Sequence, residues 1–597
     1  MKQFFKMTLA TICGIAIFLV ITGFFFVISL VGMLASDSAS TKVKENSVFV
    51  IKLNGSVDER SEQSSPLNML LGMAEGNLMG LDDLLSSIRK AKENDDVKGI
   101  YIEGGSATFD SPATAQQLRD ALKDFRQTGK WIVAYADNYA QGSYYVASVA
   151  DKVYLNKTGM LDLKGIGGKG EYYKGLLDKL GVKYQAIRVG KYKSAVERMT
   201  LTSMSERDRE QRMAYSQGIW NHWLKDIGES RKLTPEALNQ IVNDSIMALA
   251  DPNDYVKAKL VDKLMYPEEI KAEIQGRLKI DKDDDIAQIS LSDMLNVKSK
   301  NKKEGEEIAV YYAYGEIVDN LGVGLTGSEG HAIVGSETVE DLNKLAQDDD
   351  VKAVVLRVNS PGGSAVASEM IWHAVKQLKE KKPVVVSMGG LAASGGYMIS
   401  AGADYIIAEP TTITGSIGIF GLIPNFSELV TDKLGVTFDG VKTNKYTDYE
   451  ENIVLAKDNQ EELQFMQTYV NRGYNTFLGI VADGRKMKTA DVDSIAQGRV
   501  WLATDALKIK LVDKLGSLND AVKKAAELAK LKEYHTASYP GEKDWMDQLF
   551  AEEDKGTYLD GQLRAVLGDL YEPVLELRRN QGRNKLQARL PWEVRVY

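Results

Sequence analysis

The sequence predicts an α/β fold that occurs twice in one chain. The string Asp95–Ile100 (DDVKGI) returns as Asp349–Val354 (DDVKAV), 254 residues later (349 − 95), and Lys179–Val182 (KLGV) returns unchanged as Lys433–Val436 at the same spacing. In both halves short apolar strands alternate with helical stretches, which is typical of parallel βαβ units covered on both faces by helices. A chain of 597 residues is also long for a single core. We therefore expect two tandem domains of ordinary size.

The first element is an apolar segment at residues 7–34 that contains no charged residue. At about 1.5 Å per helical residue it exceeds the roughly 30 Å of a bilayer's hydrocarbon core. We expect a transmembrane anchor within residues 1–36, because the alternative, a cleavable signal peptide, has an apolar region of only about 7 to 15 residues. Lys2 and Lys6 precede the segment and Asp37 follows it, so the positive-inside bias leaves the rest of the chain outside the cytoplasm.

The two repeats are expected at residues 44–300 and 306–540. Each opens with a strand-like segment followed by a glycine, Ser47–Leu53 before Gly55 and Ile308–Tyr314 before Gly315. In the second repeat the pattern predicts further strands at 353–358, 384–387 and 405–408, and a helix over 364–380.

The remaining segments are predicted more coarsely. Residues 204–280 have a helical pattern, and residues 281–307 form a charged stretch that we interpret as a linker between the repeats. The tail at 541–597 ends in a basic stretch over 578–595, which is either a solvated helix or a contact with a partner or membrane.

Composition excludes several classes of function. Hydrophobic residues at 44% and charged residues at 26% are close to the usage of soluble globular proteins. A net charge of −9, with no basic block before the tail, argues against binding nucleic acid. The one cysteine, Cys13, lies inside the apolar segment, so the exported part has neither a disulfide nor a thiol nucleophile.

The repeats differ in the polar residues that catalysis needs. When the copies are overlaid, Gln141 falls on Ser394 and Lys193 falls on Thr447. Each copy has kept what the other lacks, which suggests one site assembled from both, with Ser394 as the nucleophile and Lys193 as its base. The neighbouring Lys191 has a counterpart in the second copy and therefore looks generic.

Two glycine-rich junctions offer backbone amides to such a site. Gly362 and Gly363 lie between a strand and the helix that follows, and Ser394 and Gly395 lie at the next junction of the same kind. Amides of Gly362 or Gly363, together with that of Ser394 or Gly395, are candidates for an oxyanion hole. The alternatives are a simple turn for the glycine pair and a helix N-cap for the serine.

The choice of base follows from the few histidines. Of His222, His331, His373 and His535, only His331 lies in a polar loop where it is tenable as a base for Ser394. Lysine serves as a base when burial lowers its pKa from about 10.4 toward neutrality. We therefore prefer Lys193 and keep His331 as the alternative.

Four motifs occur together in this chain: Asn359–Ser364 (NSPGGS), Ala393–Tyr397 (ASGGY), Thr414–Gly421 (TGSIGIFG) and Gly190–Glu197 (GKYKSAVE). With them the chain, from the anchor to about Leu531, resembles the signal peptide peptidase A (protease IV) family in its long, duplicated form. The resemblance implies tandem Clp-protease/crotonase-like domains and a membrane-anchored Ser/Lys endopeptidase that degrades cleaved signal peptides and other extended apolar peptides. It also implies that Ser416 orients the lysine, and that the protein is a homo-oligomer, commonly a tetramer.

No metal or nucleotide cofactor is expected, since neither a zinc ligand set nor a GxxxxGK[ST] loop occurs. The expected location is the bacterial cytoplasmic membrane, with one span and the catalytic domains on the extracytoplasmic side. Two other classes stay open as alternatives. One is a crotonase-like acyl-CoA enzyme, and the other is a non-catalytic membrane scaffold that has kept the fold.

Overall fold

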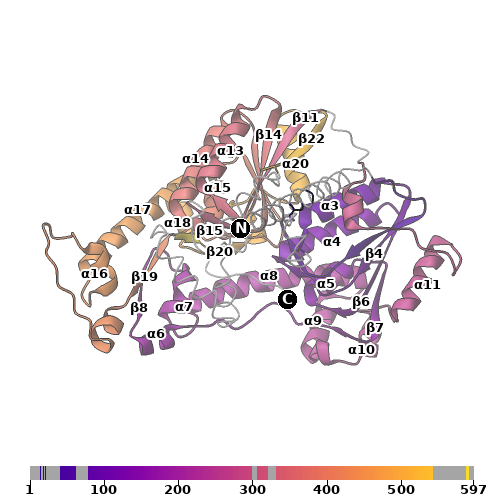
Figure 1. The fold of residues 1–597 in the computed structure, drawn as a ribbon, viewed down its shortest axis with the longest axis horizontal. Coiled ribbons are helices and arrows are strands. Elements are labelled where there is room, and N and C mark those ends of the chain that lie inside the picture. The colour runs from indigo at the N-terminus through magenta and orange to yellow at the C-terminus, as the bar shows by residue number, and fades with distance from the viewer. Residues whose placement is uncertain are drawn as a thin grey trace, which may run out of the picture.

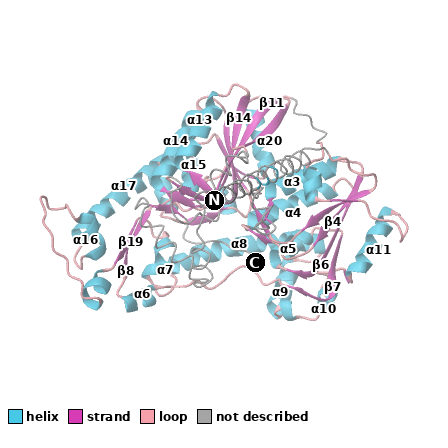
Figure 2. Cartoon of the chain, in the orientation of Figure 1, coloured by secondary structure: helices cyan, strands magenta, loops and turns pink. Residues whose placement is uncertain are grey.

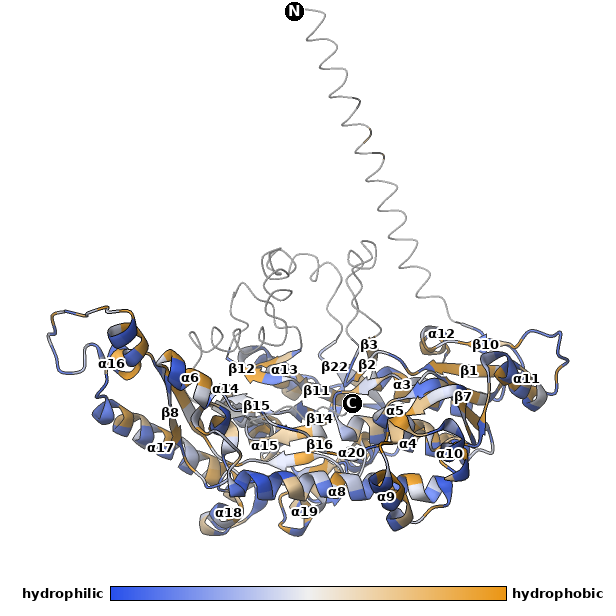
Figure 3. Ribbon diagram, turned by 90° about the horizontal axis from the view of Figure 1, so that it is seen from below, coloured by the Kyte–Doolittle hydropathy of each residue, from blue (hydrophilic) through white to orange (hydrophobic). Residues whose placement is uncertain are grey.

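The computed structural model describes residues 41–61, 78–298, 305–319 and 331–541, the single residues 14, 18 and 21, and the backbone of 587–589. The predicted anchor lies outside these ranges apart from the three single residues. None of the helices described has the length and apolar character needed to cross a bilayer. Figures 1 and 2 show two separate sheets with their helices, and Figure 3 shows that the described chain forms a shallow arc.

The first repeat is built on a sheet of six parallel strands. In spatial order they are β10 (Gln288–Ile289), β1 (Ser47–Lys52), β4 (Val97–Glu103), β6 (Trp131–Tyr139), β7 (Lys152–Leu161) and β9 (Lys263–Leu264). The prediction that residues 281–307 form a linker is thus partly wrong. Its residues 288–289 pair with β1, because the edge of this parallel sheet still has backbone groups to satisfy.

The second repeat has the same strand order. From β22 (Tyr534–Tyr539) the sheet continues through β11 (Glu306–Tyr314), β14 (Val351–Ser360), β16 (Val384–Ala393), β17 (Tyr405–Ala408) and β21 (Lys514–Leu515). These six strands match, in order, β10 to β9 of the first sheet, so the duplication inferred from short strings extends to the order of these strands; the second sheet has two further strands. The predicted helix over 364–380 is α14 (Ala365–Lys379).

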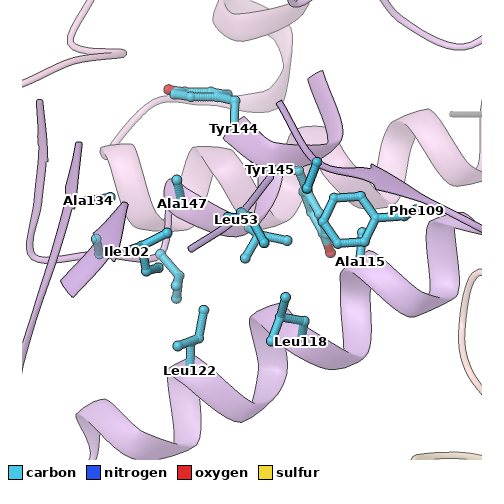
Figure 4. Close-up of a cluster of buried hydrophobic side chains, with 14 of the residues drawn as sticks. Leu53, Ile102, Phe109, Ala115, Leu118, Leu122, Ala134, Tyr144, Tyr145 and Ala147 are labelled. Carbon is cyan, nitrogen blue, oxygen red and sulfur yellow. The ribbon is translucent and has the colours of Figure 1, made fainter. Parts of the chain in front are cut away.

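Apolar side chains on both faces of each sheet explain why the strands read as continuous apolar runs. In the first repeat one face packs against α4 (Pro112–Arg126) and α5 (Gln141–Ala147), with Leu118, Leu122 and Tyr145 in the cluster shown in Figure 4. The other face packs against α11 (Pro267–Leu278). The helical prediction for 204–280 holds for most of that stretch, which β9 interrupts.

Two elements tie the repeats together. Strand β8 (Lys183–Arg188) leaves the first repeat and pairs antiparallel, over six residues, with β19 (Phe420–Asn425) of the second. Helix α8 (Glu206–Arg231) then runs back to the first repeat, where the Trp223 ring stacks on Tyr145 with centroids 4.3 Å apart. Figure 1 shows α8 bridging the arm that carries β8 and the first-repeat core.

A buried ion pair lies at the contact between the repeats. The Arg357 guanidinium on β14 donates to both carboxylate oxygens of Glu59, at 2.5 and 3.2 Å, and both side chains are at most 3% exposed. The neighbouring Asn359 amide donates to Glu59 and to Asp110, also of the first repeat. Because Asn359 immediately precedes the glycine turn of the second repeat, the first repeat helps to hold that turn.

Candidate active site

Three candidate residues follow the carboxyl ends of neighbouring parallel strands. Strand β14 ends at Ser360, just before Gly362, and strand β16 ends at Ala393, just before Ser394. Strand β18 (Ile413–Gly415) ends just before Ser416 and pairs with β16, with Ala393 opposite Gly415. The three ends meet at one edge of the sheet, which is where sites form in open α/β sheets.

Ser394 lies at a sharp turn between β16 and α15 (Gly395–Ser400). Its backbone has φ 56° and ψ −117°, a conformation that glycine adopts easily and serine rarely does. Its amide donates to the Gly415 carbonyl at 2.8 Å, which holds the turn in place. Ser394 occupies the N-cap position of α15, but its side chain makes no capping hydrogen bond to the helix, so the prediction that it serves as a helix cap is wrong.

Lys193 reaches this serine from the other repeat. Its Nζ lies 2.9 Å from Ser394 Oγ, 3.0 Å from Ser416 Oγ and 3.0 Å from the Ser416 carbonyl oxygen. The side chain is fully buried, whereas Lys191 is exposed. The segment forms a turn before a short 3-10 helix and is not extended, so the two lysines do not share a face.

Burial determines the electrostatics of Lys193. Desolvation of the amine lowers the pKa of Lys193 from 10.5 to about 7. Its three hydrogen-bond partners are two hydroxyls and a carbonyl, so no carboxylate holds the proton on the amine. A substantial fraction is therefore neutral near pH 7.

The oxyanion candidates are not equivalent. The Ser394 amide is occupied by Gly415, which leaves Gly395 on this side, at the first position of α15 where a helix amide has no intrahelical acceptor. The Gly362 amide donates to Ser360 Oγ at 3.1 Å, and Gly362 has φ 97°. Gly363 lies within β15 (Gly362–Ser364), in a ladder beside β12 (Glu316–Val318).

Several supporting residues could not be recognised from the sequence. Gln211 on α8 donates to the Tyr192 carbonyl and to Ser194 Oγ, on either side of Lys193, and accepts from the Val500 amide of the second repeat. Gly498 packs against Lys193 so closely that an added Cβ would lie 2.7 Å from the Lys193 Cβ and 2.8 to 2.9 Å from its backbone. A glycine and a glutamine in polar stretches carry no signal of this role without the partner chain segment beside them.

The residues that take the places of Ser394 and Lys193 in the opposite repeat have different roles. Gln141 is buried and holds a loop, accepting from the amides of Lys164 and Gly165. Thr447 is exposed and donates to the Asn444 carbonyl. The alternative base, His331, stacks on the Tyr314 ring at 3.7 Å and contacts the Tyr314 carbonyl.

The described residues contain no group of three or more His, Cys, Asp and Glu side chains arranged to hold a metal ion. In the arrangement that is present, a buried amine contacts the hydroxyl of a serine whose backbone conformation is unusual. Backbone amides of a helix start and of a turn lie beside it. This arrangement suits nucleophilic attack on a carbonyl carbon.

Known proteins match both repeats. The model for peptidase family S49 matches residues 124–281 and 376–532, and that for Clp protease matches residues 304–412. Protease 4 of Salmonella typhi is 35% identical over 588 residues, covering 96% of this chain and 92% of that protein. Protease 4 of Haemophilus influenzae is 36% identical over 532 residues, covering 84% and 83%. The chloroplastic serine protease SPPA of Arabidopsis thaliana is 26% identical over 496 residues, covering 82% and 70%. The family matches confirm the predicted fold class of duplicated Clp-protease-like domains.

Replacing Lys193 with Met should lower kcat for peptide hydrolysis by about 10² or more, since general-base assistance typically contributes roughly 10² to 10⁴. In the wild type, kcat/KM should rise with pH through a pKa of about 7, because the amine accepts a proton only above it. The measurement is a pH–rate profile with an apolar peptide. Lys191→Met is the control and should retain the wild-type profile, whereas equal losses in both variants would contradict the role of Lys193.

Replacing Gly498 with Ala should lower kcat by about tenfold or more, because the new methyl displaces the Lys193 backbone and a shift of about 1 Å can cost roughly 10²-fold. The matched control is Gly435→Ala. Both glycines have φ 72°, so the backbone strain is the same, but a Cβ at Gly435 meets nothing within 4 Å. Steady-state kinetics and thermal unfolding of both variants separate the two effects. Equal kcat in the two variants would refute the positioning role of Gly498.

Proposed function

The chain belongs to peptidase family S49 and is a serine protease, and we propose that Ser394 and Lys193 form its catalytic dyad. The family resemblance drawn from the four motifs is confirmed, and a serine protease is neither an acyl-CoA enzyme nor a scaffold. The observation that carries the dyad is the 2.9 Å contact between a fully buried amine and the Ser394 hydroxyl.

Hydrogen-bond accounting gives each atom a role. A neutral amine has two N–H donors and one lone pair, and the Ser416 carbonyl can only accept. One N–H therefore goes to that carbonyl. In the reactive arrangement the other N–H goes to Ser416 Oγ, and the lone pair of Lys193 accepts the Ser394 hydroxyl proton. Ser416 thus orients the base in this proposal.

The reaction then proceeds in two stages. Ser394 Oγ attacks the scissile carbonyl as Lys193 takes its proton. The amides of Gly395 and of Gly363, or of Gly362 if it exchanges its bond to Ser360 Oγ for the substrate, stabilise the oxyanion. The ammonium of Lys193 protonates the leaving amine. Water, deprotonated by Lys193, attacks the acyl-enzyme, and Lys193 returns that proton to Ser394 Oγ as the carboxylate product leaves.

The proposed substrates are cleaved signal peptides and other extended apolar peptides. The apolar segment at 7–34 would hold the enzyme at the outer face of the bacterial cytoplasmic membrane. Signal peptides have an apolar region of about 7 to 15 residues, which favours a membrane over water, so an anchored protease would meet them at high local concentration.

A serine-directed activity probe tests the dyad. Incubation of the full chain with a fluorophosphonate, followed by peptide mass mapping, should place the label on Ser394. Lys193→Met should reduce labelling, and Ser394→Ala should abolish both labelling and peptide hydrolysis while retaining the wild-type circular dichroism. Labelling of a different serine, or hydrolysis by Ser394→Ala near the wild-type rate, would refute the assignment.

The duplication also supports the proposed homotetramer. Strand β8 of the first repeat pairs with β19 of the second, over residues 183–188 and 420–425. Shifted by the repeat spacing, the equivalents are residues 437–442 and 166–171, and residues 437–442 are exposed, with Val441 99% exposed. Within one chain these two segments have no mutual ladder. Pairing of 437–442 with 166–171 of the next copy would repeat the β8–β19 joint and propagate the arc of Figure 3 into a closed ring.

Replacing Val441 with Asp should therefore convert the tetramer into smaller species, because a charge would be placed in the middle of the intermolecular joint. Light scattering after size-exclusion chromatography measures the mass. Leu249→Asp, at a site 77% exposed in the first repeat, is the control and should leave the mass unchanged. A tetramer that survives Val441→Asp would refute this joint.

A further inference from the structure

A strand from the C-terminal tail lies between the two strands that flank the candidate active site. This strand, β23 (Gln587–Arg589), is antiparallel to β15, with Arg589, Ala588 and Gln587 opposite Gly362, Gly363 and Ser364. On its other side Gln587 is opposite Phe420 of β19. The order in that sheet is β13-β12-β15-β23-β19-β8, so the tail strand completes it.

The position of β23 defines a slot for one extended peptide. Neighbouring strands lie about 4.8 Å apart, so β15 and β19 are separated by roughly twice that distance. The gap between them therefore holds one strand. β15 begins at Gly362, a candidate oxyanion residue, and β19 begins four residues after Ser416. An extended peptide in this slot therefore runs beside Ser394 and binds through its backbone, by strand addition.

We propose that the C-terminal tail occupies this slot as an internal competitor of peptide substrates. The inference rests on the proposed function for its consequence, since the slot matters to catalysis only if Ser394 is the nucleophile. Binding through the backbone accepts many sequences, so the same groups that hold a substrate hold residues 587–589.

The tether makes even weak binding effective. Residues 542–586 join the strand covalently to the rest of the chain, so its binding is intramolecular, and a linked segment typically has an effective concentration of roughly 1 mM. A strand whose intrinsic dissociation constant is also about 1 mM would fill half of the slots and double the apparent KM; one of about 0.1 mM would raise it roughly tenfold. Because the occupant competes with the substrate, kcat is unaffected.

Replacing Ala588 with Pro in the full chain tests the proposal. Proline removes a backbone donor and is not tolerated in the interior of a central strand. The apparent KM for an apolar fluorogenic peptide should fall by about two- to tenfold at unchanged kcat. Gln581→Pro, seven residues upstream in the same tail, is the matched control and should keep the wild-type KM. An unchanged KM in Ala588→Pro, or an equal fall in both variants, would overturn the proposal.

Amide hydrogen exchange reads the contact without relying on activity. In a Ser394→Ala background, which prevents cleavage of the tail, Gly362–Ser364 should exchange more slowly than after the further change Ala588→Pro. Equal exchange in the two proteins would overturn the proposal even if the dyad is correct.

Conversely, a wild-type chain that hydrolyses no peptide but shows this protection would refute the dyad and retain the contact. An apparent KM that rises with protein concentration would mean that a neighbouring copy supplies the strand, and would overturn the intramolecular assignment.

Discussion

The arrangement of this protein depends on keeping one amine out of water. In the proposed dyad Lys193 can accept the Ser394 proton near neutral pH only if its pKa falls toward 7, and desolvation by the surrounding protein causes that fall. The folded-state pKa lies below the unfolded value, so the unfolded chain binds the extra proton between about pH 7 and 10.5, and the cost to stability grows as pH falls through that window. At about 1.4 kcal/mol for each pKa unit, the cost near neutral pH is on the order of several kcal/mol. Other interactions in the fold must offset this cost in the free energy of folding.

Neither repeat can bury this side chain alone. The first repeat provides Lys193 on the turn after β8 and supports that turn through Gln211 on α8. The second repeat provides the residues that enclose this side chain. Gly498 packs against Lys193, and the carbonyl and hydroxyl of Ser416 accept hydrogen bonds from its amine. The β8–β19 ladder fixes the two parts in register, and the buried Arg357–Glu59 pair joins the repeats on the side of the glycine turn. A buried pair of this kind is weak evidence for stability but strongly disfavours separation, because either partner alone would be an uncompensated buried charge.

Two of the non-glycine residues with positive φ lie where the chemistry is proposed. Ser394 and Ser416 both have positive φ, at 56° and 50°, and both are fully buried. Each is held by a backbone hydrogen bond from its own amide, to Gly415 and to Arg499. Residues in such conformations persist when their surroundings overdetermine them. In the first repeat the corresponding junction carries Gln141, whose side chain supports a loop, so that copy has kept the fold and given the position a structural role.

The sequence by itself determined the duplication and the parallel α/β class, because repeated strings and apolar periodicity can be read along the chain without its fold. It also predicted Ser394 and Lys193 as complementary site residues. The repeat comparison favoured Lys193 over Lys191, but it could not show that Lys193 is buried, since burial depends on a turn packed against Gly498 of the other repeat. It assigned residues 281–307 to a linker because short edge strands such as β10 carry almost no periodic signal. The tail strand was equally invisible: three residues in a basic stretch become a strand only where β15 and β19 leave a gap one strand wide. Local pattern fixes which elements form, whereas burial, pKa and pairing at edges depend on residues that the chain brings together only when it folds.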